Sequence, residues 1–176
     1  VTPDGVRVAV GAALRKIAEL PDVAGLAVAV SLELTDAELL QAAGEGALLG
    51  AYRFEPITAV SKPAPVASIA LVSSLLGSDQ KDAVSRAKAT AEAVCQARDW
   101  GNTPPNLLYP ETFAEAARAY VRDERIAVEI LDEKALERGG YGGILAVGGG
   151  SARGPRLVRL SYAPRGAEAH LALVGK

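Results

Sequence analysis

Residues 95–117 read CQARDWGNTPPNLLYPETFAEAA and contain the break that organises the chain. A residue that precedes proline is disfavoured in the helical conformation, so the consecutive prolines of GNTPPN (residues 101–106) predict an extended connection. Pro110 and Glu111 then supply the fixed φ angle and the acidic first turn that are typical of a helix start. This stretch therefore predicts the end of one helix, the best candidate for a boundary between two units, and a second helix over residues 110–123.

The segment before this break predicts the longest helix of the chain, from Ser78 to about Trp100. Small and apolar residues recur there at three- and four-residue steps, which is the pattern of one helix face. They are Ala83, Ala87, Ala91, Val94 and Cys95. Because most of these side chains are small, they allow another element to approach closely. We interpret Cys95, the only cysteine, as a small buried hydrophobe and not as a nucleophile.

Two further helix and strand pairs are predicted on the N-terminal side of this helix. Apolar residues at helical intervals predict a helix over residues 5–20, and Thr35-Asp-Ala-Glu38 is a capping box that predicts the start of another. The short apolar runs GLAVAVSL (25–32) and VASIALVSS (66–74) predict strands, the first of them buried. A glycine inside a helix costs roughly 1 kcal/mol relative to Ala, so the glycines of GEGALLG indicate close packing.

On the C-terminal side, strands and helices continue to alternate. IAVEIL (126–131) predicts a strand, and DEKALERGG (132–140) predicts a short helix closed by glycine. Three apolar or alternating stretches follow: ILAVGGG (144–150), PRLVRLSYA (155–163) and HLALVGK (170–176), of which the last is typical of a strand. The alternation predicts an α/β fold with mostly parallel sheets.

Composition bounds the class of protein. The 176 residues are 49% apolar and 23% charged, which is typical of a globular protein with a sizeable core. A net charge of -2 argues against a strongly basic nucleic-acid binder. One Cys and one His exclude a disulfide framework and a His/Cys-based zinc site, and they favour a reducing, cytosolic setting. No apolar run approaches the roughly 20 residues of a membrane-spanning helix, and the first residues do not resemble a signal peptide.

The chain contains no Met and stops inside an apolar run, so we expect it to be a piece of a longer protein.

Two stretches are candidates for ligand binding. The glycine-rich segment 139–151, GGYGGILAVGGGS, could hold phosphate through its backbone amides, but a strand rather than a helix is expected after it, so we favour tight turns.

Arginines at four nearby positions could form a surface for anions or nucleic acid. Because alternate residues of a strand face opposite sides, we favour solvated charges or ion pairs instead. These arginines are Arg153, Arg156, Arg159 and Arg165.

The only histidine and the acidic residues are considered as catalytic residues. His170, the only histidine, has no identifiable partner acid, and we interpret it as a structural residue at a strand start. The acidic pairs Glu111/Glu115 and Asp123/Glu124 lack the pattern of an active-site dyad. The residues alone therefore reveal no catalytic centre.

The order of four segments nevertheless resembles the cytosolic leucine aminopeptidase family, whose members are two-metal exopeptidases. The most specific parts are ARDxxNTPPN, within residues 97–106, and the final VGK. The full set is GEGALLGAYRF (44–54), AVCQARDWGNTPPNLLYPETFAEAA (93–117), ILDEKALERGGYGGILAVGGGSARGPRLVRLSY (130–162) and LALVGK (171–176). Trp100, Tyr109 and Tyr141 depart from the family pattern at positions that affect packing and helix capping more than chemistry.

This resemblance implies a fold and a division into domains. It implies part of an N-terminal mixed α/β domain (1–77), a long connecting helix (78–101), and the opening strands and helices of a second, catalytic α/β domain (102–176). Lys176 matches the family lysine whose neutral amine binds one of two metal ions. In the family the carboxylate ligands of both metals, a second catalytic Lys and an assisting Arg follow VGK, so we expect the present chain alone to bind no metal tightly and to be inactive.

The resemblance also implies the setting of the longer protein. It implies two divalent ions (Mn²⁺ or Zn²⁺), peptide substrates, a cytoplasmic location and a homo-oligomer, specifically a hexamer, with no membrane association. Two alternatives remain open. One is a non-catalytic binding or scaffold module that engages nucleic acid or a partner protein, and the other is a small nucleotide-binding domain built on the glycine-rich segment.

Overall fold

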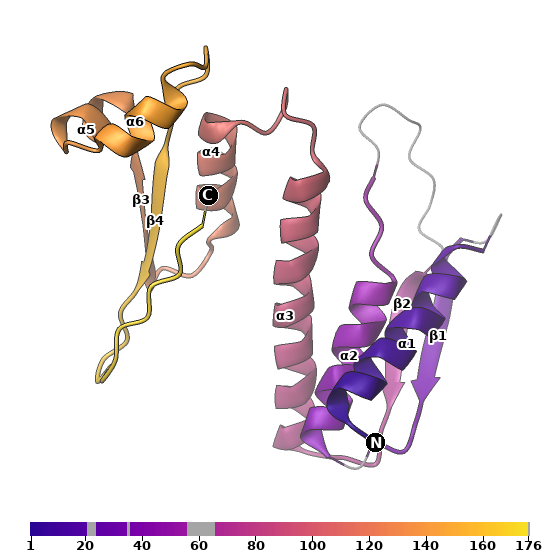
Figure 1. Ribbon diagram of the computed structural model, residues 1–176. Helices are drawn as coiled ribbons and strands as arrows, with labels where there is room; N and C mark the ends of the chain where they lie inside the picture. Colours follow the sequence, from indigo (N-terminus) through magenta and orange to yellow (C-terminus); the bar gives the residue numbers. More distant parts are fainter. Residues whose placement is uncertain (21–23, 35, 56–65, 176) are drawn as a thin grey trace. The chain divides into compact units, whose positions relative to one another are not determined.

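The computed structural model describes residues 1–20, 24–34, 36–55 and 66–175. The chain divides into two compact units, Val1–Asn102 and Thr103–Lys176 (Figure 1).

The first unit is built on a two-stranded parallel sheet. Its elements are α1 (Pro3–Ala18), β1 (Leu26–Ser31), α2 (Ala37–Gly50), β2 (Val66–Val72) and α3 (Ser78–Asn102). Side chains of both strands, among them Val28 and Leu71, pack against the buried residues of α1 and α2. Burial alternates along β1, so only one face of this strand is covered, and the prediction of a buried strand was wrong for its other face.

Helix α2 packs closely against two neighbouring helices through its glycines. A Cβ atom on Gly44 would lie 2.8 Å from the Cβ of Ala87 in α3. One on Gly46 would overlap the carbonyl oxygen of Arg7 in α1, and one on Gly50 would overlap that of Gly11. The expectation that these helix glycines serve close packing is confirmed.

A carboxylate is buried in this contact. The side chain of Glu45 in α2 accepts hydrogen bonds from Arg7 Nε at 2.7 Å and from Gln41 Nε2 at 2.8 Å, while Gln41 accepts from Arg86 Nε at 2.9 Å. Glu45 is 5% exposed, and a buried charge of this kind is tolerated because it is paired and hydrogen-bonded. The network connects α1, α2 and α3.

The helix starts differ from the predicted ones by a few residues. Helix α1 begins at Pro3 because the side chain of Thr2 accepts a hydrogen bond from the Gly5 amide. Asp36 is the N-cap of α2, accepting from the Leu39 amide at 2.9 Å, so the capping box assigned to Thr35 was wrong in its cap residue. Thr35 itself lies outside the described residues.

The second unit contains an antiparallel strand pair and three short helices. Its elements are α4 (Pro110–Tyr120), β3 (Ile126–Leu131), α5 (Glu133–Arg138), α6 (Gly142–Gly148) and β4 (Leu157–Tyr162). Ile126 lies opposite Tyr162, and Leu131 opposite Leu157. The bounds of β3 match the sequence prediction. The prediction of mostly parallel sheets was wrong for this unit, because β4 pairs with β3 in the antiparallel direction.

Two apolar stretches of this unit adopt unexpected structures. ILAVGGG (144–150) contributes most of its residues to α6, which places a helix inside the glycine-rich segment. Residues 170–175 are exposed and have no regular secondary structure, so the strand predicted for HLALVGK was wrong over these residues. Within the described part of the chain no strand pairs with them, and an apolar sequence without a hydrogen-bonding neighbour does not form a ladder.

Candidate functional site

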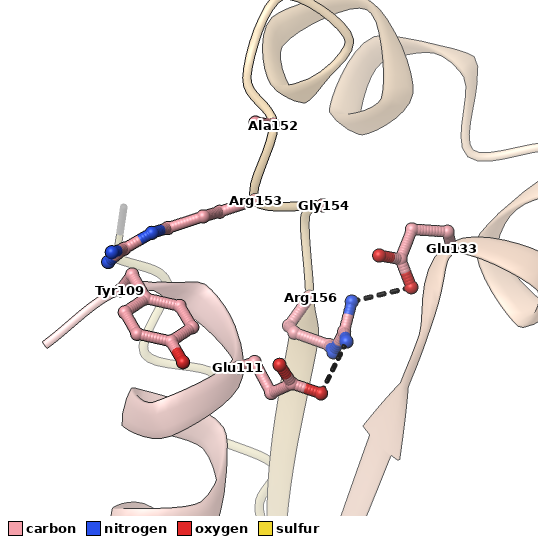
Figure 2. Close-up of a pocket in the computed structure, with 7 residues that line it drawn as sticks. All are labelled: Tyr109, Glu111, Glu133, Ala152, Arg153, Gly154 and Arg156. Carbon is pink, nitrogen blue, oxygen red and sulfur yellow. Dashed lines mark hydrogen bonds and ion pairs between the residues drawn. The ribbon is translucent and has the colours of Figure 1, made fainter. Parts of the chain in front are cut away.

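The most developed polar site of the second unit surrounds Arg156, which lies directly before β4. Its guanidinium forms ion pairs with Glu133 (Nη1 to Oε2, 2.6 Å) and with Glu111 (Nη2 to Oε1, 3.1 Å), as Figure 2 shows. Nη1 also donates to the carbonyl oxygen of Pro155 at 3.0 Å. The Arg156 side chain is 13% exposed, whereas both glutamates are about half exposed. One largely buried cation is therefore shared by two carboxylates.

Local helix starts bring these carboxylates to the site. Glu111 is in the first turn of α4, which follows Tyr109 and Pro110. The Thr112 hydroxyl accepts from the Tyr109 amide at 3.0 Å and fixes this start. Glu133 opens α5, whose N-cap Asp132 accepts from the Ala135 amide at 2.8 Å. Acidic residues are favoured in the first turn by the helix dipole, so the sequence places Glu111 and Glu133 for reasons of local stability.

The ion pairs keep the site charged. The hydrogen bond from Arg156 lowers the pKa of the Glu133 carboxyl, and the hydrogen bond to Glu133 is the main cause of a raised pKa of Arg156. The Glu133 carboxylate also lies against Gly154, where a Cβ atom would overlap it. A glycine is therefore required for the carboxylate to occupy this position.

Arg153 forms the opposite wall. Its guanidinium carbon lies 3.9 Å from the centre of the Tyr109 ring, and Nη1 donates to the carbonyl oxygens of Pro105 at 3.0 Å and Asn106 at 3.2 Å. In the part of the chain that the structure describes, Arg153 forms no ion pair with a carboxylate.

These groups line an open cavity of about 340 Å³. Figure 2 shows Arg153 beside Tyr109 and apart from the cluster of Arg156 with its two glutamates. The lining residues are Tyr109, Glu111, Glu133, Ala152, Arg153, Gly154 and Arg156. The cavity offers charges of both signs for binding, and it has no nucleophile paired with a base.

The remaining arginines of the predicted cluster are separate from this cavity. Arg159 forms an ion pair with Glu129 across the β3–β4 pair. Arg165 is exposed and belongs to no ion pair among residues 66–175. Solvated charges or ion pairs were the favoured interpretation of the cluster, and ion pairs are found for Arg156 and Arg159. No sequence pattern connects Glu133 with Arg156, which is why this partner was not predicted.

The other candidate residues lie apart from each other. Cys95 is half-buried on α3 and not fully buried as predicted, and burial raises the pKa of its thiol. His170 is exposed and outside any strand, so its assignment to a strand start was wrong. Asp123 pairs with Arg125, whose hydrogen bonds lower its pKa to about 2. Glu115 forms no ion pair with any described residue.

The described residues do not fit a metal site. No group of three or more His, Cys, Asp or Glu side chains among them lies close enough together to hold a metal ion. Lys176, the predicted metal ligand, lies outside the described residues. Among the helices described, none is both long and apolar enough to cross a membrane.

Residues 95–176 match the catalytic domain of the cytosol aminopeptidase family. The chain is 47% identical over 174 residues to a probable cytosol aminopeptidase of Cutibacterium acnes, covering 98% of this chain and 34% of that protein. It is 48% identical over 178 residues to the probable cytosol aminopeptidase of Rhodococcus opacus, covering 97% and 34%. The chain thus spans about a third of the length of these relatives.

Solved structures are similar over nearly the whole chain. The bottromycin maturation enzyme BotP in complex with Mn is 30% identical with a TM-score of 0.77, over 94% of this chain and 34% of that one. A tomato leucine aminopeptidase mutant has a TM-score of 0.78 at 23% identity, over 96% of this chain and 35% of that one, and this likeness concerns the fold alone.

Proposed function

The chain belongs to the cytosol aminopeptidase family, and on this premise we propose that it is part of a metal-dependent enzyme that removes N-terminal amino acids from peptides. The observation that carries the proposal is sequence identity of 47% over 98% of the chain to a probable cytosol aminopeptidase. This identity covers both units, including the segments GEGALLGAYRF and GNTPPN.

We propose the domain division on the same basis. Residues 1–77 would belong to an N-terminal α/β domain, 78–101 would form the connecting helix, and 102–176 would open the catalytic domain. The match to the family's catalytic domain starts at residue 95, within α3, and extends to the last residue. The segment GEGALLGAY, before the connecting helix, contacts the end of that helix within the first unit. Tyr52 donates a hydrogen bond to Asp99 Oδ1 at 2.8 Å.

The proposed cofactor is a pair of divalent metal ions, Mn²⁺ or Zn²⁺. The manganese in the BotP complex supports Mn²⁺ as one candidate. Lys176 would bind one ion through its neutral amine, since a nearby dication favours the deprotonated form of a ligand. When bound, paired divalent ions activate a water molecule and polarise the peptide carbonyl.

The cellular setting is also a proposal. Relatives are named cytosol aminopeptidases, which supports a cytoplasmic location. Peptides would be the substrates and a hexamer the assembly of the longer protein. The ion pairs of Arg156 and Arg159, together with a net charge of -2, disfavour the alternative of a nucleic-acid-binding module.

The test is hydrolysis of L-leucine p-nitroanilide by the full-length protein that contains this chain. We expect activity with Mn²⁺ or Zn²⁺ that disappears on chelation and returns on addition of metal. Lys176→Ala should lower both metal occupancy and hydrolysis, while Lys16→Ala, which changes an exposed lysine of α1, should leave both unchanged. A full-length protein that is folded, metal-loaded and inactive would overturn the proposal.

A further inference from the structure

The charges around the Arg153–Arg156 cavity are not evenly distributed. Glu111 and Glu133 share the single guanidinium of Arg156, so this cluster has one negative charge in excess. Arg153 has one positive charge that no described carboxylate neutralises. Lys134 acts on Glu133 only through a weak Coulomb interaction and does not line the cavity. The cavity therefore has a net negative side and a net positive side.

The charged groups are accessible and held in place. Glu111 and Glu133 are 53% and 47% exposed, so each can accept a further hydrogen bond from a ligand. Arg153 is fixed by its two bonds to backbone carbonyls and by the Tyr109 ring, and only Nη1 is used in the carbonyl bonds. A site whose groups are already oriented loses little conformational entropy on binding.

From this arrangement we propose that the cavity binds a small zwitterion, specifically a free α-amino acid. The carboxylate of the amino acid would pair with Arg153, and its ammonium group would pair with Glu111 and Glu133. The volume of about 340 Å³ lies at the lower end of the range of roughly 300–1,000 Å³ that is typical of small-molecule sites. A simple anion or a simple cation would match only one side of the cavity.

This inference is independent of the proposed hydrolase function. It requires neither metal nor catalysis, so its failure would leave the proposed peptidase unaffected. Free amino acids are also what an aminopeptidase releases, so the proposed ligand would be a product of the proposed reaction.

The experiment is a titration of the 176-residue chain in metal-free buffer, followed by amide chemical shifts of the cavity residues Ala152 and Gly154. The probes are L-leucine, N-acetyl-L-leucine, which lacks the ammonium group, and L-leucinamide, which lacks the carboxylate. We expect saturable shifts with leucine and a loss of roughly tenfold or more in affinity for each analogue, because each loses a charge-assisted hydrogen bond.

Variants test the assignment of each side. Arg153→Gln should weaken leucine binding roughly tenfold and leucinamide binding much less, because leucinamide has no carboxylate. Glu111→Gln should weaken leucine binding roughly tenfold and N-acetyl-leucine binding much less, because N-acetyl-leucine has no ammonium group. Arg159→Gln is the matched control, because Arg159 pairs with Glu129 away from the cavity. The proposal is overturned if leucine gives no saturable shift, if either analogue binds the unmodified chain as well as leucine, or if Arg159→Gln weakens binding as much as Arg153→Gln. The comparison of ligands on the unmodified chain decides the question even if a variant fails to fold.

Discussion

At the scale of single residues, the pairing of Glu133 with Arg156 makes stability depend on pH. Arg156 lowers the pKa of Glu133 in the folded chain, so the folded state favours the ionised carboxyl. This contribution is fully present above the ordinary carboxyl pKa of about 4.5 and disappears as the pH falls through the lower folded-state value. The sign follows from proton binding, since between the folded and the unfolded pKa values the unfolded chain binds more protons at this site.

We therefore predict that Arg156→Gln lowers the urea midpoint at pH 7 and flattens its fall as the pH drops below about 4.5. The matched control is Arg159→Gln, which removes an ion pair in which both side chains are at least 47% exposed, and it should change the midpoint less. Parallel pH curves for the unmodified chain and Arg156→Gln would contradict this account.

A second residue-scale prediction concerns Cys95. Burial raises the pKa of its thiol, so the thiolate is a smaller fraction at neutral pH than in a free thiol. We predict that Cys95 reacts several-fold more slowly with a disulfide reagent at pH 8 than glutathione does, and that the difference disappears in urea. If Cys95 in the folded chain reacts as fast as glutathione, its half-buried position does not protect the thiol.

At the scale of elements, the glycines of α2 confirm the close helix packing that the sequence predicted. Gly46→Ala would place a methyl group onto the carbonyl of Arg7, and we predict a loss of about 1–3 kcal/mol in the free energy of unfolding. Gly101→Ala is the matched control within α3, where no heavy atom lies within 4 Å of an added Cβ, and it should stabilise by up to about 1 kcal/mol. Urea unfolding of both variants provides the comparison, and a neutral Gly46→Ala would refute close packing as the reason for this glycine.

Most elements were predictable because their patterns are local. The stripe Ala83, Ala87 and Ala91 lies buried on α3, and IAVEIL forms β3, since periodicity and β-branched residues determine both. The antiparallel pairing of β4 depends on its partner strand β3, which a single sequence does not reveal, and the pattern of ILAVGGG did not indicate its helical state. A short apolar run is compatible with either state.

The candidate site was predictable only in part, for the same reason. The arginine cluster and its involvement in ion pairs followed from charge and strand periodicity, but Glu133 and Tyr109 reach Arg156 and Arg153 only through the fold. The predicted metal ligand Lys176 stays a prediction.

At the scale of the whole molecule, the division into two units leads to a proteolysis prediction. The boundary between Asn102 and Thr103 lies within GNTPPN, at the end of α3. We expect limited proteolysis to cut near residues 101–106 before it cuts inside residues 78–101, because a helix must open locally before a protease can cleave it. Mass spectrometry of the first fragments measures the order, and initial cleavage within 78–101 would contradict the proposed domain division.

Whether this chain is part of a metal-dependent aminopeptidase is decided by what the full-length protein does to a defined peptide. A peptide with a free N-terminus and its N-acetylated counterpart are incubated with the Mn²⁺-loaded protein and followed by mass spectrometry. We expect stepwise loss of N-terminal residues from the free peptide and none from the acetylated one. Internal cleavage, equal attack on both peptides, or no cleavage of either would contradict it.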